Sequence, residues 1–294
     1  MIRSLSVIIL VILGFSLSGH AQQKRALIIC VGEQLDKSWG NINAENDLLY
    51  VQKLLNYCGY NDISNIRGRD ATKQGIVNKF DEFTHRCTKG DIIYIHFSGH
   101  GQRMTDINGD EQRIRDKDRY DESWIPYDAY MTYCEQDKGE KHLSDDEVAQ
   151  LLSKIKTKIG SEGNILVVVD ACHSGGSTRG PDDLYMGLCT RGAEKYFEIP
   201  TSNYALTSKS DITEEWLTLS ACADYQVNVE CVSPKVGKLT YILYELRRSI
   251  HKMSNDEFRR AVSNMMNSPE FKAPLRQDPV LSEYKCDIKR FFQK

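Results

Sequence analysis

The 294-residue chain lacks several features that mark specialised classes of protein. It has no excess of basic residues, since 38 Lys and Arg stand against 41 Asp and Glu and give a net charge of −3. It also lacks internal repeats, low-complexity tracts and a Cys-x-x-Cys pair. These absences argue against a nucleic-acid partner and against a zinc site built from cysteines. With 40% hydrophobic and 27% charged residues, the composition is that of a globular protein able to bury a core.

One long apolar run occurs, at the start of the chain. Arg3 precedes a largely apolar segment from Leu5 to Leu17, and small residues follow at Gly19-His20-Ala21. The run is shorter than the roughly 18 apolar residues that a membrane span needs, so it predicts a cleaved export signal over residues 1–21 rather than an anchor. We therefore expect residues 22–294 to form a single domain, without a stable membrane anchor, in a periplasmic or secreted protein.

Short apolar strands alternate with amphipathic helices along the chain. Apolar runs predict buried strands at 26–31, 63–66, 91–97, 165–169 and 216–221. Apolar residues at helical spacing predict helices at 48–58, 70–83 and 144–159, the last opened by a capping box. This alternation predicts an α/β fold with a mostly parallel sheet covered on both faces.

Two polar turns follow buried strands of the predicted sheet. His100, flanked by Gly99 and Gly101, follows one strand, and Cys172 follows another. Because sites in parallel sheets form beyond the carboxyl ends of the strands, we expect both side chains on one rim. A thiolate attacks amides, and an imidazole can take the thiol proton and later protonate the leaving amine. The backbone N–H groups of Cys172 and Gly99 are the expected oxyanion donors.

The residues around both turns resemble the motifs of a known family. Tyr94-Ile-His-Phe-Ser-Gly-His-Gly101 and Val168-Val-Asp-Ala-Cys-His-Ser-Gly175 are similar to the histidine and cysteine motifs of metacaspases and other caspase-like cysteine peptidases. Other similar stretches bring the resemblance to about Lys24–Ser282. It implies a caspase-like three-layer α/β/α sandwich with Cys172 as the nucleophile and His100 as the general base and acid. Neither a third catalytic residue nor a cofactor is required for this chemistry.

The resemblance also implies which peptides are cleaved. Asp47, Ser98 and Asp170 match the residues that line the family's pocket for the side chain before the scissile bond. Two carboxylates in a pocket favour a cation, because an unpaired buried carboxylate is unfavourable and a guanidinium can bridge both. We therefore expect a cysteine endopeptidase acting on peptides or proteins after Arg or Lys.

The irregular stretch at 176–215 contains basic residues that such an enzyme could cut in its own chain. A solvated loop is the alternative interpretation of this stretch, and exposed loops are the preferred sites of nicking. The candidate residues for self-cleavage are Arg179, Arg191, Lys195 and Lys209.

Calcium stimulation is a further implication of the resemblance. Asp121, Asp145 and Asp146 match ligand positions of the family, and Ca²⁺ selects carboxylate oxygens. Arg179 stands where the family has another aspartate, with Asp182 nearby, so the ligand set is incomplete. Asp145 and Asp146 are also explained as first-turn acids that complement a helix dipole.

Two other functions fit the same motifs. A clostripain-like cysteine peptidase shares the fold, the dyad and the preference for basic residues, whereas a catalytically inactive binding module keeps the fold alone. The matches at Asn43–Asp47 and in the acidic loop after the histidine favour a metacaspase. The presence of both Cys172 and His100 favours an active enzyme.

Overall fold

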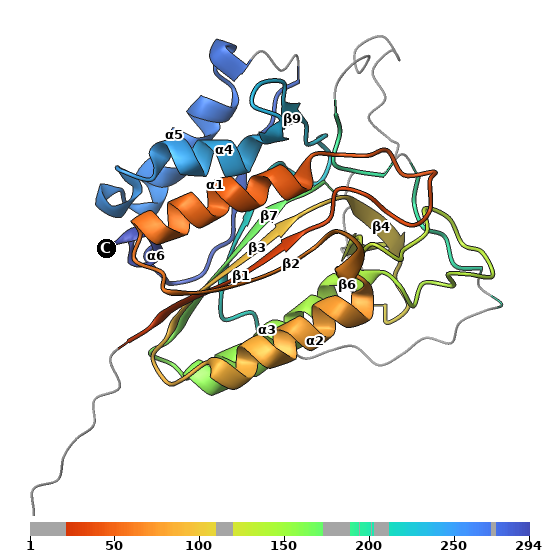
Figure 1. Cartoon of the computed structure of the whole chain (residues 1–294), viewed down its shortest axis with the longest axis horizontal. Helices are drawn as coiled ribbons and strands as arrows, with labels where there is room; N and C mark the ends of the chain where they lie inside the picture. Colours follow the sequence, from red (N-terminus) through yellow and green to blue (C-terminus); the bar gives the residue numbers. More distant parts are fainter. Residues whose placement is uncertain are drawn as a thin grey trace, which may run out of the picture.

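The chain folds around a six-stranded sheet (Figure 1). This computed structural model describes residues 22–109, 120–172, 189–193, 195–200, 202, 212–271 and 275–294. Across the sheet the strands run in the order β11 (Val280–Leu281), β8 (Leu217–Ser220), β7 (Asn164–Asp170), β3 (Ile92–Ser98), β1 (Lys24–Cys30) and β2 (Asp62–Arg67). All neighbours pair in parallel except β8 and β11. The prediction of an α/β fold with a mostly parallel sheet is confirmed.

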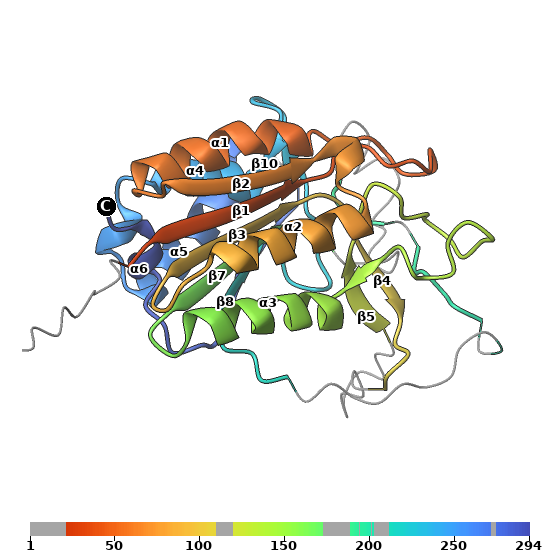
Figure 2. The same ribbon diagram turned by 60° about the horizontal axis from the view of Figure 1, so that its bottom comes forward.

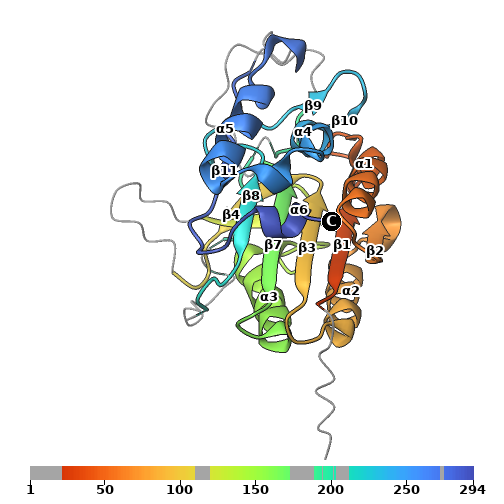
Figure 3. The same cartoon turned by 90° about the vertical axis from the view of Figure 1, so that its left-hand side faces the viewer.

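Helices cover both faces of the sheet (Figures 2 and 3). One face carries α1 (Ala44–Tyr57), α4 (Lys238–Leu246), α5 (Asn255–Met266) and α6 (Lys289–Phe292). The other face carries α2 (Lys73–Arg86) and α3 (Asp145–Ile159). Short 3-10 turns occur at Gly68–Asp70, Ile250–Lys252 and Pro269–Phe271. These layers are the predicted three-layer α/β/α sandwich.

The burial of β1 explains why its apolar run is continuous. Ile28 and Cys30 belong to the core under α1 and α4, whereas Leu27 and Ile29 belong to the core under α2 and α3. Both faces of the strand are therefore buried in hydrophobic cores. A strand buried on both faces cannot alternate apolar with polar residues, which is the pattern that the sequence presents.

Two small sheets were missing from the prediction. One is antiparallel and contains β4 (Gly101–Thr105), β5 (Tyr120–Trp124) and β6 (Leu143–Ser144), and the other pairs β9 (Glu230–Cys231) with β10 (Val236–Gly237). These strands are short and several are polar, so they carry little hydrophobic periodicity. Because β4 begins directly after His100, the first small sheet adjoins the carboxyl end of β3.

The start of α3 agrees with its sequence signal. The Ser144 hydroxyl accepts a hydrogen bond from the Glu147 backbone, and the Glu147 carboxylate accepts one from the Ser144 backbone. This is the predicted capping box. Within the described ranges, none of the helices combines the length and apolar character that crossing a bilayer requires. The predicted export signal at 1–21 lies outside these ranges.

Candidate active site

The two predicted catalytic side chains lie beyond the carboxyl ends of adjacent strands. Ser98 on β3 is opposite Asp170 on β7, and His100 and Cys172 each follow two residues later. Both residues are buried. The backbone N–H groups of Cys172 and of Gly101, the residue after His100, donate to one shared carbonyl oxygen, at 2.9 and 3.2 Å. The fold therefore brings the two turns together on one rim.

The His100 imidazole is held in one orientation. Its Nε2 lies 2.7 Å from the Gly40 carbonyl oxygen, and because a carbonyl can only accept, Nε2 carries the proton. The Trp39 ring packs 5.0 Å from the imidazole, centroid to centroid. Nδ1 is buried and makes no hydrogen bond to any described residue. The neutral ring therefore presents Nδ1 as a proton acceptor.

Burial keeps that ring neutral. Desolvation lowers the pKa of His100 to about 4, an effect that the hydrogen bond to Gly40 only partly opposes. At neutral pH the imidazole is accordingly uncharged, as a general base must be before it accepts a proton. The Gly40 carbonyl is an orienting group that sequence reasoning missed, because a backbone oxygen has no residue-type signal.

The Cys172 thiol lies among backbone carbonyls and a second thiol. Its Sγ donates to the Gln226 carbonyl oxygen at 2.8 Å, and Cys222 Sγ lies 3.5 Å from the same oxygen. A hydrogen bond to Cys172, together with burial, raises the pKa of Cys222 well above its ordinary value. None of the nine cysteines is in a disulfide. The Cys172 thiol donates to a carbonyl, so attack on a substrate carbonyl needs its proton to be removed.

The shared carbonyl between the two turns belongs to Arg191. The Cys172 N–H is one of its donors, and the other is the Gly101 N–H rather than that of Gly99. Gly99 instead lies tightly over Phe97, where a Cβ atom would come within 2.8 Å of the ring. The peptide after His100, and not the one before it, thus faces this oxygen.

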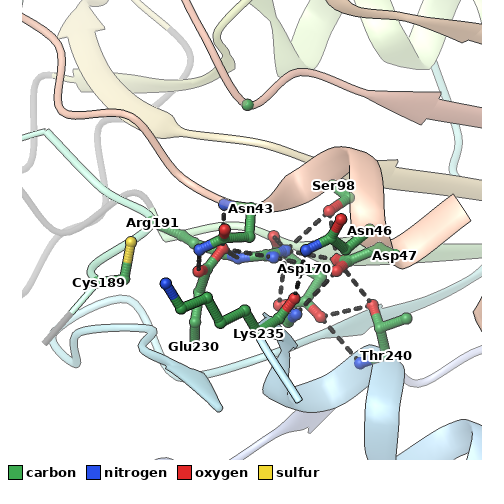
Figure 4. Close-up of polar contacts among 12 residues, drawn as sticks. Asn43, Asn46, Asp47, Ser98, Asp170, Cys189, Arg191, Glu230, Lys235 and Thr240 are labelled. Carbon is green, nitrogen blue, oxygen red and sulfur yellow. Dashed lines mark hydrogen bonds and ion pairs between the residues drawn. The ribbon is translucent and has the colours of Figure 1, made fainter. Parts of the chain in front are cut away.

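The Arg191 side chain extends into a cluster of buried acids (Figure 4). We call Asp47, Asp170 and Glu230, together with the Ser98 hydroxyl, the acidic cluster. Arg191 Nη1 donates to Asp47 Oδ2 at 2.7 Å and to Ser98 Oγ at 2.7 Å. Nη2 donates to Asp47 Oδ1 at 3.2 Å and to Glu230 Oε1 at 2.8 Å. The three residues predicted from the resemblance therefore surround one guanidinium.

The Asp170 carboxylate attracts the Arg191 guanidinium mainly through its charge. Its Oδ1 lies 3.6 Å from Arg191 Nη1, while Asn228 and Thr240 hold the carboxylate with hydrogen bonds of 2.7 to 2.8 Å. Burial opposes its ionisation, but the Arg191 charge and these hydrogen bonds outweigh burial and lower the pKa of Asp170. Burial and the neighbouring Asp170 raise the pKa of Asp47 despite the attraction of Arg191. The single positive charge of the guanidinium thus faces the three carboxyl groups of the acidic cluster, more than one charge can neutralise.

Glu230 is the member of the cluster that sequence reasoning missed. It lies on β9, and its Oε1 accepts from both Nε and Nη2 of Arg191, at 3.2 and 2.8 Å. Asn43 holds the carboxylate from the other side through its backbone and side-chain N–H groups, at 2.8 and 2.6 Å. A single glutamate in the sequence gives no sign of its own burial, so only the tertiary contact identifies it.

The predicted calcium positions lie apart from the acidic cluster. Asp121 is on β5, and Asp145 and Asp146 open α3. Asn108 Nδ2 donates to Asp146 Oδ2. Within the described ranges, no three His, Cys, Asp or Glu side chains are grouped as a metal site would require. Arg179 and Asp182, at the remaining position of the set, lie outside the described ranges, so calcium binding stays a prediction.

Comparisons with known proteins agree with the predicted family and fold. The model of the caspase domain family matches residues 23–287. Metacaspase-2 of Trypanosoma brucei brucei is 26% identical over 172 residues, which cover 58% of this chain and 43% of that protein. Metacaspase-1 of Arabidopsis thaliana is 32% identical over 107 residues, 36% of this chain and 25% of that protein. The chain thus matches less than half the length of these curated relatives.

Solved structures share the fold at lower identity. Protein GSU0716 from Geobacter sulfurreducens aligns with a TM-score of 0.62 and 21% identity, over 92% of this chain and 97% of that one. Caspase-1 from Spodoptera frugiperda aligns with a TM-score of 0.56 and 10% identity, over 89% and 86%. The central sheet with its flanking helices is therefore a caspase-like fold. Because the caspase-domain model matches residues 23–287, most of this chain, the chain belongs to the caspase domain family.

Proposed function

We propose that the protein is a cysteine endopeptidase that hydrolyses peptide bonds after arginine or lysine, with Cys172 and His100 as its catalytic pair. One observation carries the proposal: an arginine side chain lies in the acidic cluster while its own carbonyl oxygen accepts from the Cys172 N–H. A peptide bound in this way has its carbonyl carbon beside the nucleophile.

The charge of the acidic cluster supports the preference for basic residues. Asp47, Asp170 and Glu230 are each at most 4% exposed. An aspartate side chain in the same place would add a fourth carboxylate away from solvent, which is strongly unfavourable. A guanidinium gains charge-assisted hydrogen bonds that bridge two of the acids. Cleavage after Arg or Lys, and not after Asp, follows from this contrast.

The proposed chemistry uses groups held in place by the backbone. Nδ1 of His100 accepts the Cys172 proton, because Nε2–H is already donated to Gly40. The Cys172 and Gly101 N–H groups stabilise the negative charge that develops on the carbonyl oxygen. Removal of one such donor in other enzymes slows turnover by about 10²–10³-fold. The imidazolium then protonates the leaving amine.

The test compares turnover of matched fluorogenic peptides ending in Arg, Lys or Asp by the wild-type protein. We expect hydrolysis of the Arg and Lys peptides and its loss in Cys172→Ala and His100→Ala. Cys134→Ala is a matched control, since Cys134 is a partly exposed thiol whose backbone forms a turn with Asp137. Faster hydrolysis of the Asp peptide would refute the specificity. No hydrolysis of any peptide would favour an inactive caspase-fold binding module.

The proposal has two further parts, export of the protein and stimulation of the enzyme by calcium. The first 21 residues support export to the periplasm or the medium. N-terminal sequencing of the protein from cell fractions tests this part.

The calcium part is tested by comparing Arg-peptide turnover in EGTA with turnover in added Ca²⁺, for the wild type and for a double variant that carries Asp121→Asn and Asp146→Asn. We expect Ca²⁺ to raise turnover of the wild type only. Equal turnover in EGTA and Ca²⁺ would remove the ion from the mechanism.

A further inference from the structure

A segment of the chain lies across the site in the way that an extended peptide binds. In residues 189–193, the Arg191 N–H donates to the Asn228 carbonyl at 2.9 Å, and the Ala193 N–H donates to the Gly101 carbonyl at 3.0 Å. The Cys189 carbonyl accepts from the Glu230 N–H at 2.9 Å. Backbone hydrogen bonds on both sides hold this segment as an added strand, which is how many proteins bind extended peptides.

Arg191 occupies the position of the residue before a scissile bond. Its side chain is fully buried in the acidic cluster, so at this residue the stretch is not the solvated loop that sequence alone allowed. A structural ion pair would need the guanidinium only. Here the carbonyl oxygen is also held, by the N–H of the nucleophile itself and by that of Gly101. The backbone contacts therefore distinguish a bound substrate from a buried salt bridge.

The residue after Arg191 passes directly beside the nucleophile. A Cβ atom on Gly192 would lie 3.4 Å from Cys172 Sγ and 3.0 Å from the Cys172 carbonyl oxygen. The chain after Arg191 therefore passes close to the sulfur, on the side where the leaving amine of a cut Arg191–Gly192 bond would be, and glycine leaves room for this approach.

We propose that Arg191–Gly192 is a self-cleavage bond and that residues 189–193 block the site until this bond is cut. This inference rests on the proposed function and adds the bond at which the enzyme cuts its own chain. Of the four basic residues named above as candidates for self-cleavage, the structure favours Arg191. Lys195 is exposed, and Arg179 and Lys209 lie outside the described ranges.

The cleavage balances as a hydrolysis. The thiol proton moves to His100, Sγ bonds to the Arg191 carbonyl carbon, and the electron pair of the carbonyl goes to its oxygen. Collapse of this intermediate breaks the carbon–nitrogen bond to Gly192, and the imidazolium protonates the new amine. Water, deprotonated by His100, then attacks the thioester and releases the Cys172 sulfur. The sulfur recovers its proton, and Arg191 becomes a C-terminal carboxylate after one water is consumed.

Tethering makes the uncut segment an effective inhibitor. A segment joined to its own site has an effective concentration in the mM range, whereas a peptide substrate is assayed at about 10 μM. With similar intrinsic affinities, the segment excludes the peptide by a factor of about 100. Uncut protein should then hydrolyse Arg peptides about 100-fold more slowly than cut protein, and the progress curve should show a lag that follows the appearance of fragments.

The first experiment follows the full chain during incubation by intact mass spectrometry and by N-terminal sequencing of the fragments. We expect wild-type protein to give one fragment ending at Arg191 and another starting at Gly192, and Cys172→Ala to stay intact. The first-order rate constant should not change on 100-fold dilution, because the bond is cut within its own molecule. Fragments that map to another bond, or an apparent first-order rate constant that rises in proportion to protein concentration, would overturn the inference.

Variants separate this inference from the proposed function. Arg191→Lys should be cut more slowly at the same bond, since Lys lacks the fork that contacts both Asp47 and Glu230. Lys195→Ala, the matched control in the same stretch, should be cut at the wild-type rate. Hydrolysis of Arg peptides without a lag, by protein that remains intact at 191–192, would overturn the inference and leave the proposed function standing. Absence of Arg-peptide hydrolysis by both cut and intact protein would overturn both.

Discussion

Substituting Glu230 by Gln should weaken recognition of arginine more than recognition of lysine. Glu230 Oε1 accepts from two guanidinium nitrogens of Arg191, Nε and Nη2. A lysine ammonium has no second nitrogen with which to form this fork. Glu230→Gln keeps the shape of the side chain and removes its charge, so it tests the contact with little change in volume.

The magnitude follows from the hydrogen bonds that lose their charged acceptor. A hydrogen bond to a charged group contributes about 1.5–3 kcal/mol. Loss of this amount from the transition-state complex lowers kcat/KM for an Arg peptide by about 10- to 150-fold. Because the Lys peptide loses only the longer-range attraction, we expect the Arg-to-Lys ratio of kcat/KM to fall by about tenfold.

The assay measures kcat/KM of cut enzyme for matched Arg and Lys peptides. Asn43→Ala is the control, because it removes the side-chain donor that holds Glu230 and keeps the carboxylate. It should change the Arg-to-Lys ratio by much less, and thermal melting checks that both variants fold. An equal fall in kcat/KM for the Arg and Lys peptides would refute the role of the forked hydrogen bonds. An unchanged kcat/KM for the Arg peptide would refute any contact of Glu230 with substrate.

Four further predictions concern the catalytic base, the pH dependence of stability, the support of the base and the core. His100 has a pKa of about 4, so activity should be retained as pH falls through 6.5 and be half-maximal near pH 4; an acid limb at pH 6 to 7 would contradict the buried neutral base. His96 has the same lowered pKa, so in urea titrations the free energy of unfolding should decline as pH falls from 6.5 toward 4, where only the unfolded state gains the protons. Trp39→Ala should lower kcat by about 10- to 100-fold with little change in KM, because the ring positions His100 without touching the acidic cluster; a rise in KM alone would place Trp39 in substrate binding. Ile155→Ala, at a fully buried position of α3, should destabilise the fold by about 2–5 kcal/mol in urea unfolding, whereas the exposed Lys158→Ala should change stability by less than about 0.5 kcal/mol.

The parts of the fold that the sequence predicted well are those with strong local periodicity. The central strands β1, β3 and β7 are apolar on both faces, and α3 has a capping box and an apolar stripe. The buried positions of a helix or strand recur at a fixed spacing along the sequence, so neighbouring residues are enough to show the pattern. The small sheets around the site have no such repeat, and they were missed for that reason.

The sequence by itself determined the two turns that follow buried strands, and with them the residue types of the proposed dyad. Only the tertiary structure decided what surrounds those side chains. The Gly40 carbonyl fixes the imidazole, the Gln226 carbonyl accepts a hydrogen bond from the Cys172 thiol, and Glu230 lies beside Arg191. Backbone oxygens have the same chemistry at every residue, and Arg191 and Asp47 are 144 positions apart along the chain. Contacts of this kind depend on how distant segments pack, so no local pattern of residues can reveal them.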